Sequence, residues 1–207
     1  ANPLYVGIMS GTSLDGVDAV LANFSGGAPR MIGNHFRPYP DDLRRSLLAL
    51  QDVGSNELHR AALLSNTVTE EYAAAVEALL GPHGEPGVAA IGCHGQTVRH
   101  RPEAGYTIQL VNGALLAERT GLTAITDFRS RDIAAGGEGA PLVPAFHEAC
   151  FRHASQTRAI INIGGIANIT CLPCAGPISG FDTGPGNLLM DGWVRRQLGA
   201  DFDRDGA

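Results

Sequence analysis

The chain has 207 residues, 44% of them hydrophobic, which fits one large domain or two small ones with a buried core. Its formal net charge of −6 comes without a block of Lys or Arg, which argues against nucleic acid and anionic membranes as partners. No run reaches the ~18 apolar residues of a membrane span, and the N-terminus lacks a secretion signal. We therefore expect a cytoplasmic protein.

The first fifty residues alternate between apolar runs and short polar loops. Residues 4–9 predict a strand, residues 10–18 a small-residue loop and residues 19–24 a second strand, because too few residues intervene for a helix. A third strand is expected at 32–39, which would close an antiparallel meander. A helix should follow from Asp41. Its predicted apolar face consists of Leu43, Leu47, Leu48 and Leu50.

The middle of the chain predicts helices and buried strands in alternation. Residues 57–80 have helical spacing, and the strand 88–91 should present residues 92–97 as a ligand-touching loop at its carboxyl end. Residues 129–139 are polar and Gly-rich, and we expect them to be extended. Further strands are predicted at 106–110 and 122–128, and further helices at 114–119 and 142–151.

The strand–loop–strand pattern of residues 4–24 recurs more weakly at 158–172. Two similar units indicate two lobes of related fold with a cleft between their loops. The boundary should fall between residues 129 and 157, and we place the lobes at 1–140 and 141–207. The second lobe would then be too short to bury a proper core, so we expect it to be incomplete.

The four cysteines are too few and too scattered to predict a disulfide framework. Cys171 and Cys174 have the spacing of a metal knuckle or a redox pair, but no second Cys or His pair stands at the distance that a zinc site needs. The favoured interpretation is two reduced cysteines around a proline turn.

Residues 180–187 place a single acid, Asp182, among glycines and a proline that favour a tight turn. Asn187 suits the N-cap of a following helix. From these residues alone, Asp182 could be a general base, a magnesium ligand or a turn former, and the turn former is favoured.

The loop at residues 11–16 matches neither the Walker pattern nor the Rossmann fingerprint. Its backbone N–H groups and the hydroxyls of Thr12 and Ser13 would nevertheless suit a phosphate. Asp15 and Asp18 could hold Mg²⁺ directly or through water. An ordinary hairpin turn is an equally good interpretation.

Charged side chains near the middle of the chain have alternative interpretations. His94 could touch a ligand or be hydrogen-bonded within the core. Arg129 and Arg131 would point the same way from an extended segment and could clamp a carboxylate or a phosphate. They could equally be solvated, or paired with Asp127 and Asp132.

Six segments occur together and in order, namely residues 11–18, 93–97, 127–132, 136–147, 162–168 and 180–187. In combination they are far more specific than any one alone. The combination resembles the anhydro-N-acetylmuramic acid kinases, members of the sugar kinase–actin superfamily. The resemblance covers nearly the whole chain, and it implies that roughly the C-terminal half of a family-length protein is missing, including a second acidic residue and the adenine pocket.

The resemblance implies an α/β fold with a ribonuclease H-like (actin-like ATPase) first lobe and the beginning of a similar second lobe. It implies that ATP, with Mg²⁺, phosphorylates 1,6-anhydro-N-acetylmuramic acid while the anhydro ring opens, giving N-acetylmuramic acid 6-phosphate in murein recycling. It also suggests a homodimer. The implied residues are Gly11, Thr12, Ser13, Leu14, Asp15, Gly16, Val17, Asp18, Gly164 and Gly165 for the ATP phosphates, Asp182 as the base, and Gln96, Thr97 and Arg131 for the sugar.

The rival hypothesis is a non-catalytic actin-like module that binds ATP and assembles, since that fold also serves proteins without a sugar substrate. The polar residues at 94–97 and 129–131 favour the enzyme, because a filament protein does not need them. A dinucleotide oxidoreductase is a poor third choice, because no Gly-rich loop opens a helix in the required context.

Overall fold

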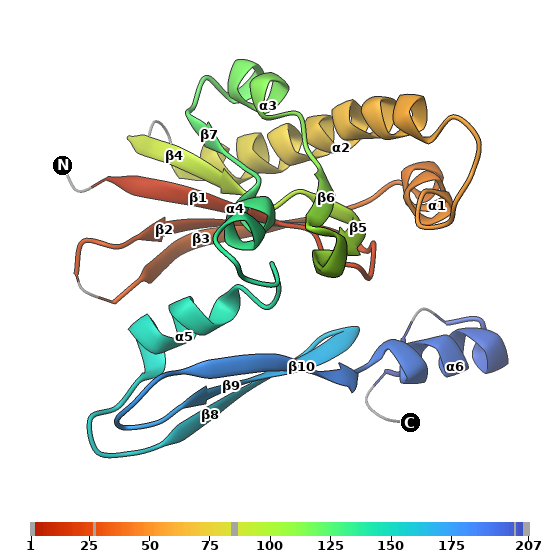
Figure 1. Ribbon diagram of the computed structural model, residues 1–207. Coiled ribbons are helices and arrows are strands. Elements are labelled where there is room, and N and C mark those ends of the chain that lie inside the picture. The colour runs from red at the N-terminus through yellow and green to blue at the C-terminus, as the bar shows by residue number, and fades with distance from the viewer. Residues whose placement is uncertain (1–2, 27, 84–86, 201, 205–207) are drawn as a thin grey trace. The chain divides into compact units, whose positions relative to one another are not determined.

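The computed structural model describes residues 3–26, 28–83, 87–200 and 202–204. The chain divides into two compact units, Ala1–Gly139 (unit 1) and Ala140–Ala207 (unit 2). Each unit has a sheet of its own (Figure 1). The division falls one residue before the lobe boundary that the sequence suggested.

Unit 1 is organised around a five-stranded mixed sheet. Its strands are β1 (Leu4–Met9), β2 (Gly16–Asn23), β3 (Arg30–Pro38), β4 (Val88–Cys93) and β7 (Ala124–Ile125). They lie in the order β3-β2-β1-β4-β7. β1, β2 and β3 form the expected antiparallel meander, β4 is parallel to β1, and β7 is parallel to β4. This order is that of a ribonuclease H-like sheet, so the predicted α/β fold class is confirmed.

Helices and a hairpin complete unit 1. The helices are α1 (Asp41–Ala49), α2 (Glu57–Leu80), α3 (Gly113–Thr120) and α4 (Phe128–Ala134), with short 3₁₀ turns η1 (Gly81–His83) and η2 (Pro102–Ala104). The hairpin pairs β5 (Gln96–Arg101) with β6 (Tyr106–Leu110). Figure 1 shows α2 lying across the sheet with α3 beside it, and α2 contacts β2, β3 and α3.

The core of unit 1 lies between its sheet and α2. β1 and β2 alternate, so that Val6, Ile8, Val17, Ala19 and Leu21 are buried, as the period of two along a strand requires. They pack with buried side chains of α2, which are Val68, Tyr72, Ala75, Val76 and Leu79. No helix in the described parts of the chain is both long and apolar enough to cross a membrane.

Unit 2 is a smaller antiparallel meander with two helices. Its elements are α5 (Val143–Phe151), β8 (Arg158–Ile163), β9 (Ile166–Leu172), β10 (Ser179–Pro185) and α6 (Leu188–Leu198). The strands lie in the order β10-β9-β8. Few of its side chains are buried, and Leu172 and Thr170 are the most completely enclosed of them.

Four predicted details are wrong. Leu48 is 61% exposed, because Leu43, Leu47 and Leu50 alone follow the helical stripe. Residues 122–128 contain only the two-residue strand β7, and Phe128 begins α4. Residues 92–97 do not form one loop, because β4 runs to Cys93 and β5 starts at Gln96. Residues 179–185 are a strand rather than a turn.

Candidate functional site

The turn between β1 and β2 is the predicted phosphate loop. The Leu14 N–H donates to the Gly11 carbonyl over 3.3 Å, and the Ser13 hydroxyl donates to Asp15 Oδ1 over 2.8 Å. Leu14 has a left-handed φ of 57°, which is unusual for a residue with a Cβ. The loop is therefore tightly closed between Gly11 and Asp15. Of the segment implied by the resemblance, Gly16, Val17 and Asp18 belong to β2 instead.

Two carboxylates stand at the end of this loop. The Asp15 and Asp18 side chains are both exposed, and the pKa of Asp18 is raised, first by partial burial and second by repulsion from Asp15. Asp15 closes the loop, and Asp18 follows it on β2. Magnesium is commonly held by one or two carboxylates together with water and phosphate oxygens, so this pair fits it. Within the described residues, no group of three or more His, Cys, Asp or Glu side chains gathers around a common point.

His94 is engaged inside unit 1. Its Nε2 accepts a hydrogen bond from Arg129 Nε at 2.7 Å, and its Nδ1 lies 2.7 Å from the Gly95 carbonyl. A carbonyl can only accept, so Nδ1 carries the proton and the ring is neutral. Burial and then the Arg129 charge lower the pKa of His94. Of the two interpretations that the sequence left open, this geometry supports the hydrogen-bonded histidine.

The two candidate arginines lie on a helix rather than on an extended segment. Residues two apart on a helix diverge by ~200°, so Arg129 and Arg131 do not point the same way. Arg129 also donates to the Gly139 carbonyl at 2.9 Å, whereas Arg131 is exposed. Asp132 accepts from the Gly139 N–H at 2.7 Å. The expectation of an extended segment with both arginines pointing the same way is thus wrong. Arg131 remains the candidate for an anionic ligand.

The predicted sugar residues on β5 have different environments. Thr97 is half-buried, and its hydroxyl oxygen accepts from Gln109 Nε2 at 3.2 Å. Since that oxygen is already an acceptor, its own proton is available to a ligand acceptor. Gln96 is 0% exposed, and its Nε2 donates to the Gly11 carbonyl at 3.0 Å. No part of the Gln96 side chain is therefore accessible to a sugar in this structure.

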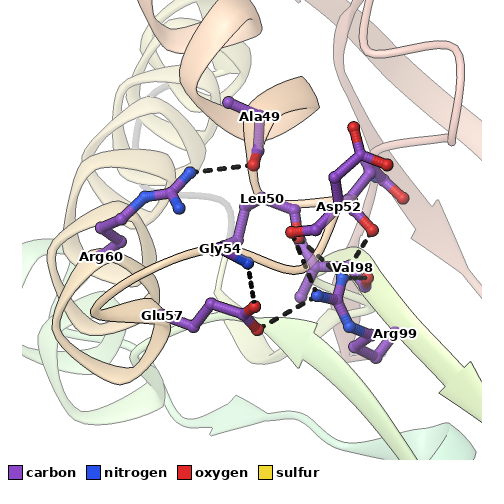
Figure 2. A network of polar contacts seen from close by, with 9 residues as sticks. Ala49, Leu50, Asp52, Gly54, Glu57, Arg60, Val98 and Arg99 are labelled. Atoms are coloured by element: carbon purple, nitrogen blue, oxygen red, sulfur yellow. Dashed lines mark hydrogen bonds and ion pairs between the residues drawn. The ribbon is translucent and has the colours of Figure 1, made fainter.

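A guanidinium anchors β5 to the connection between α1 and α2 (Figure 2). Arg99 Nη1 donates to the carbonyls of Leu50 at 2.7 Å and Gln51 at 2.9 Å. Its Nη2 lies 3.1 Å from Glu57 Oε2, and the other oxygen of Glu57 accepts from the Gly54 N–H at 2.6 Å. The strand that carries Gln96 and Thr97 is therefore fixed to the rest of unit 1.

In unit 2, Asp182 lies on β10 with its side chain exposed. The neighbouring Thr183 hydroxyl donates to the Ala167 carbonyl at 3.1 Å. The pairing of β10 with β9 shifts between Asp182 and Gly184, and Gly184 has a φ of 129°, which favours glycine. No ion pair involves Asp182 among the described residues. Its carboxylate is thus free to meet water or a ligand.

The glycine turn between β8 and β9 is bonded to the start of α6. The Asn187 N–H donates to the Gly164 carbonyl at 2.9 Å, and the Gly186 N–H donates to the Gly165 carbonyl at 2.8 Å. A Cβ on Gly186 would lie 2.2 Å from the Gly164 oxygen, so this close approach requires glycine. Asn187 is the N-cap residue of α6, as predicted, but its side chain makes no capping bond.

A family model described as anhydro-N-acetylmuramic acid kinase matches residues 3–207. The chain belongs to this family. Curated relatives of that name come from Nitrosomonas europaea (60% identical, 98% of this chain, 57% of the relative) and Thiobacillus denitrificans (57% identical, 98% of this chain, 55% of the relative). The chain thus spans little more than half the length of these relatives.

Solved structures also resemble the chain at low identity. One is the crystal structure of the Aquifex aeolicus member of the Ppx/GppA protein family, at 11% identity and a TM-score of 0.45. The match covers 92% of this chain and 54% of that one.

The structure adds candidate site residues that the sequence alone did not indicate. Asn168 pairs in register with Asp182 on one side and with Asn162 on the other, which puts a row of three polar residues across the sheet of this kinase-family chain. Among the described residues, the Oδ1 atom of Asn168 is buried without a hydrogen-bond partner. Antiparallel pairing across the Gly164–Gly165 turn was the signal that could have placed Asn162 opposite Asn168.

Proposed function

We propose that the family-length protein carrying this sequence is an ATP-dependent kinase that phosphorylates 1,6-anhydro-N-acetylmuramic acid. The anhydro ring opens in the same reaction, and the product is N-acetylmuramic acid 6-phosphate. The observation that carries the proposal is membership of the kinase family along residues 3–207, with an exposed acid at position 182. We assign the reaction to cytoplasmic murein recycling.

Phosphoryl transfer mainly requires positioning and neutralisation of charge. The backbone N–H groups and hydroxyls of the loop from Gly11 to Asp15 would hold the ATP phosphates, with Gly164 and Gly165 approaching the transferred group. Mg²⁺ held by Asp15 or Asp18 would neutralise phosphate charge when bound.

Asp182 acts as the general base for ring opening. Its carboxylate takes a proton from a water molecule as the water oxygen bonds to the anomeric carbon. The bond between the anomeric carbon and O6 breaks. The electron pair on O6 attacks the γ-phosphorus of ATP, and ADP departs. Because O6 forms a new bond to phosphorus as it leaves the anomeric carbon, it needs no proton from a general acid. In inverting glycosidases, by contrast, a general acid protonates the leaving oxygen.

Thr97 and Arg131 orient the sugar. The Thr97 hydroxyl donates to a sugar oxygen, because its acceptor side is already occupied by Gln109. The exposed guanidinium of Arg131 pairs with the lactyl carboxylate. α4 contacts β6, the partner strand of β5, so both residues belong to neighbouring elements of unit 1.

Asp182→Asn in the family-length protein tests the base. Turnover should fall by about 10²–10⁴-fold, because asparagine cannot take the proton. Affinities for ATP and for the anhydro sugar, measured by calorimetry, should stay near those of the wild type. Glu148→Gln, which removes an acid of the surface ion pair with Arg152, is the control and should retain activity. Turnover that survives in Asp182→Asn would refute the assignment.

The rival proposal is an ATP-binding assembly module without a sugar substrate. The exposed Arg131 and the donor hydroxyl of Thr97 favour the kinase, since assembly does not call for them. ATP turnover with and without anhydro-N-acetylmuramic acid separates the two. Hydrolysis that is independent of sugar and accompanies assembly would support the module.

A further inference from the structure

We propose that Gln96 is a positioning residue for the phosphate loop and that a buried set of four polar residues holds this loop in shape for ATP. The inference rests on the proposed function and deepens it. The set consists of Ser10, Tyr39, Tyr72 and Gln96, all within unit 1.

The first contact holds the beginning of the loop. Gln96 Nε2 donates to the Gly11 carbonyl, which also accepts from the Leu14 N–H across the turn. Both acceptor directions of that carbonyl are therefore in use. Gln96 is completely buried, so this bond is shielded from competing water.

The second contact holds the end of the loop. The Tyr39 N–H donates to the Asp15 carbonyl at 3.1 Å, so the loop is fixed at Gly11 by Gln96 and at Asp15 by Tyr39. The Tyr39 hydroxyl lies 3.4 Å from Gln96 Oε1 and 3.5 Å from the Tyr72 hydroxyl. Its single proton serves one acceptor at a time, and donation to Oε1 orients the Gln96 amide so that Nε2 faces Gly11.

The third contact fixes the residue just before the loop. The Ser10 and Tyr72 hydroxyls lie 2.8 Å apart, and both residues are buried. Tyr72 comes from the middle of α2, the long helix on the sheet. The loop and the residue before it are thus tied to β5, to Tyr39 just after β3, and to α2, which are distant from one another in sequence.

The loop needs such support because one of its residues is in an unfavourable conformation. Leu14 combines a left-handed φ with a side chain that is only 4% exposed. Such a conformation persists only where surrounding contacts enforce it, and residues of this kind cluster at functional sites. The four buried residues provide the enforcing contacts, and the loop N–H groups are held in one arrangement.

Gln96→Met in the family-length protein is the principal test. Methionine is unbranched and of similar size, but it leaves the Gly11 carbonyl without its second donor. We expect a drop of about tenfold or more in kcat/KM for ATP, which is ~1.4 kcal/mol of transition-state stabilisation. The KM for the anhydro sugar should stay within about twofold, since Gln96 does not reach it. Tyr72→Phe should act in the same direction, more weakly.

Thr69→Val is the matched control. It removes a completely buried hydroxyl from the same helix, but that hydroxyl bonds to the Ser65 carbonyl and the Asn112 N–H instead of the loop. It should lower the melting temperature as Tyr72→Phe does and leave the KM for ATP unchanged. A merely structural role for the set predicts that both variants lose stability and neither changes the kinetics for ATP.

The kinetics of these variants separate the proposal from its alternatives. The proposal would be overturned if Gln96→Met and Thr69→Val had the same kinetics for ATP. It would also be overturned if Gln96→Met raised only the KM for the sugar, because Gln96 would then be a sugar ligand. If Gln96→Met fails to fold, Tyr72→Phe carries the comparison. If the wild type shows no sugar-dependent turnover, the proposed function fails. ATP affinity measured by calorimetry on the same variants then still tests the loop.

Discussion

At the scale of single residues, Asp18 shows how a candidate magnesium ligand can oppose stability. Partial burial and the neighbouring Asp15 raise its pKa, so the folded state favours the neutral carboxyl. The stability that Asp18 contributes is present below its ordinary pKa of 3.8 and is lost as the pH rises through the raised value. At neutral pH the ionised group therefore destabilises the fold unless a cation lies beside it.

Asp18→Asn should raise the melting temperature at pH 7, by on the order of 1–2 °C for a partly solvated charge in a chain of this size. The difference from the wild type should shrink as the pH falls toward the ordinary pKa of the carboxyl. Added Mg²⁺ and ATP should stabilise the wild type more than the variant. Calorimetric scans measure all three effects. A variant that is less stable than the wild type at pH 7 would contradict the assigned cause of the pKa shift.

The roles of individual residues were only partly readable from the sequence. The small residues of the phosphate loop and the acid at 182 stood out because their types suit turns, phosphates and proton transfer. The burial of Gln96 could not be predicted from the sequence, because it depends on Tyr39 and Gly11. These residues are distant in sequence and contact Gln96 only in the folded chain. For the same reason, the Arg129–His94 contact could not be distinguished from a ligand clamp.

At the scale of elements, Arg99 joins β5 to the α1–α2 connection through carbonyls and one carboxylate. Its side chain is 18% exposed and that of Glu57 34%, so the contacts are partly shielded from solvent. An arginine fork can satisfy several acceptors at once, whereas a lysine ammonium is a compact charge on a flexible stem. The attachment of β5 through Arg99 therefore depends on the shape of the guanidinium group.

Arg99→Lys should lower the free energy of unfolding by about 1 kcal/mol, because partly buried carbonyls lose charged donors. Arg101→Lys is the matched control on the same strand. Its guanidinium is 3.8 Å from Glu103, with both side chains more than half exposed, so its loss should be close to zero. Urea denaturation of the two variants provides the comparison. If both variants lost the same free energy of unfolding, the Arg99 contacts would contribute nothing beyond surface charge.

Elements with strong local periodicity were predicted well. The bounds of α2, β1 and β6 coincide with the expected ranges, because apolar spacing over those windows determines each of them. β10 was missed because its Gly and Pro residues favour a turn locally, and pairing with β9 overrides that preference. α4 was missed because a polar, Gly-rich stretch carries no helical stripe.

At the scale of the whole molecule, the two units differ in how much they bury. Unit 1 encloses a continuous core between its sheet and α2. Unit 2 leaves large apolar side chains exposed on its strands and on α6, among them Ile161, Ile163, Phe181, Leu189 and Trp193. The chain is also little more than half as long as its relatives.

The central claim is that Asp182 activates water against the anhydro sugar while the loop of unit 1 holds ATP. A crystal structure of the family-length protein with a non-hydrolysable ATP analogue and 1,6-anhydro-N-acetylmuramic acid tests it most directly. We predict the Asp182 carboxylate within hydrogen-bond distance of a water molecule beside the anomeric carbon, with the γ-phosphate on the O6 side of the sugar. An Asp182 side chain directed away from the sugar, or phosphates bound far from the Gly11–Asp15 loop, would contradict the account.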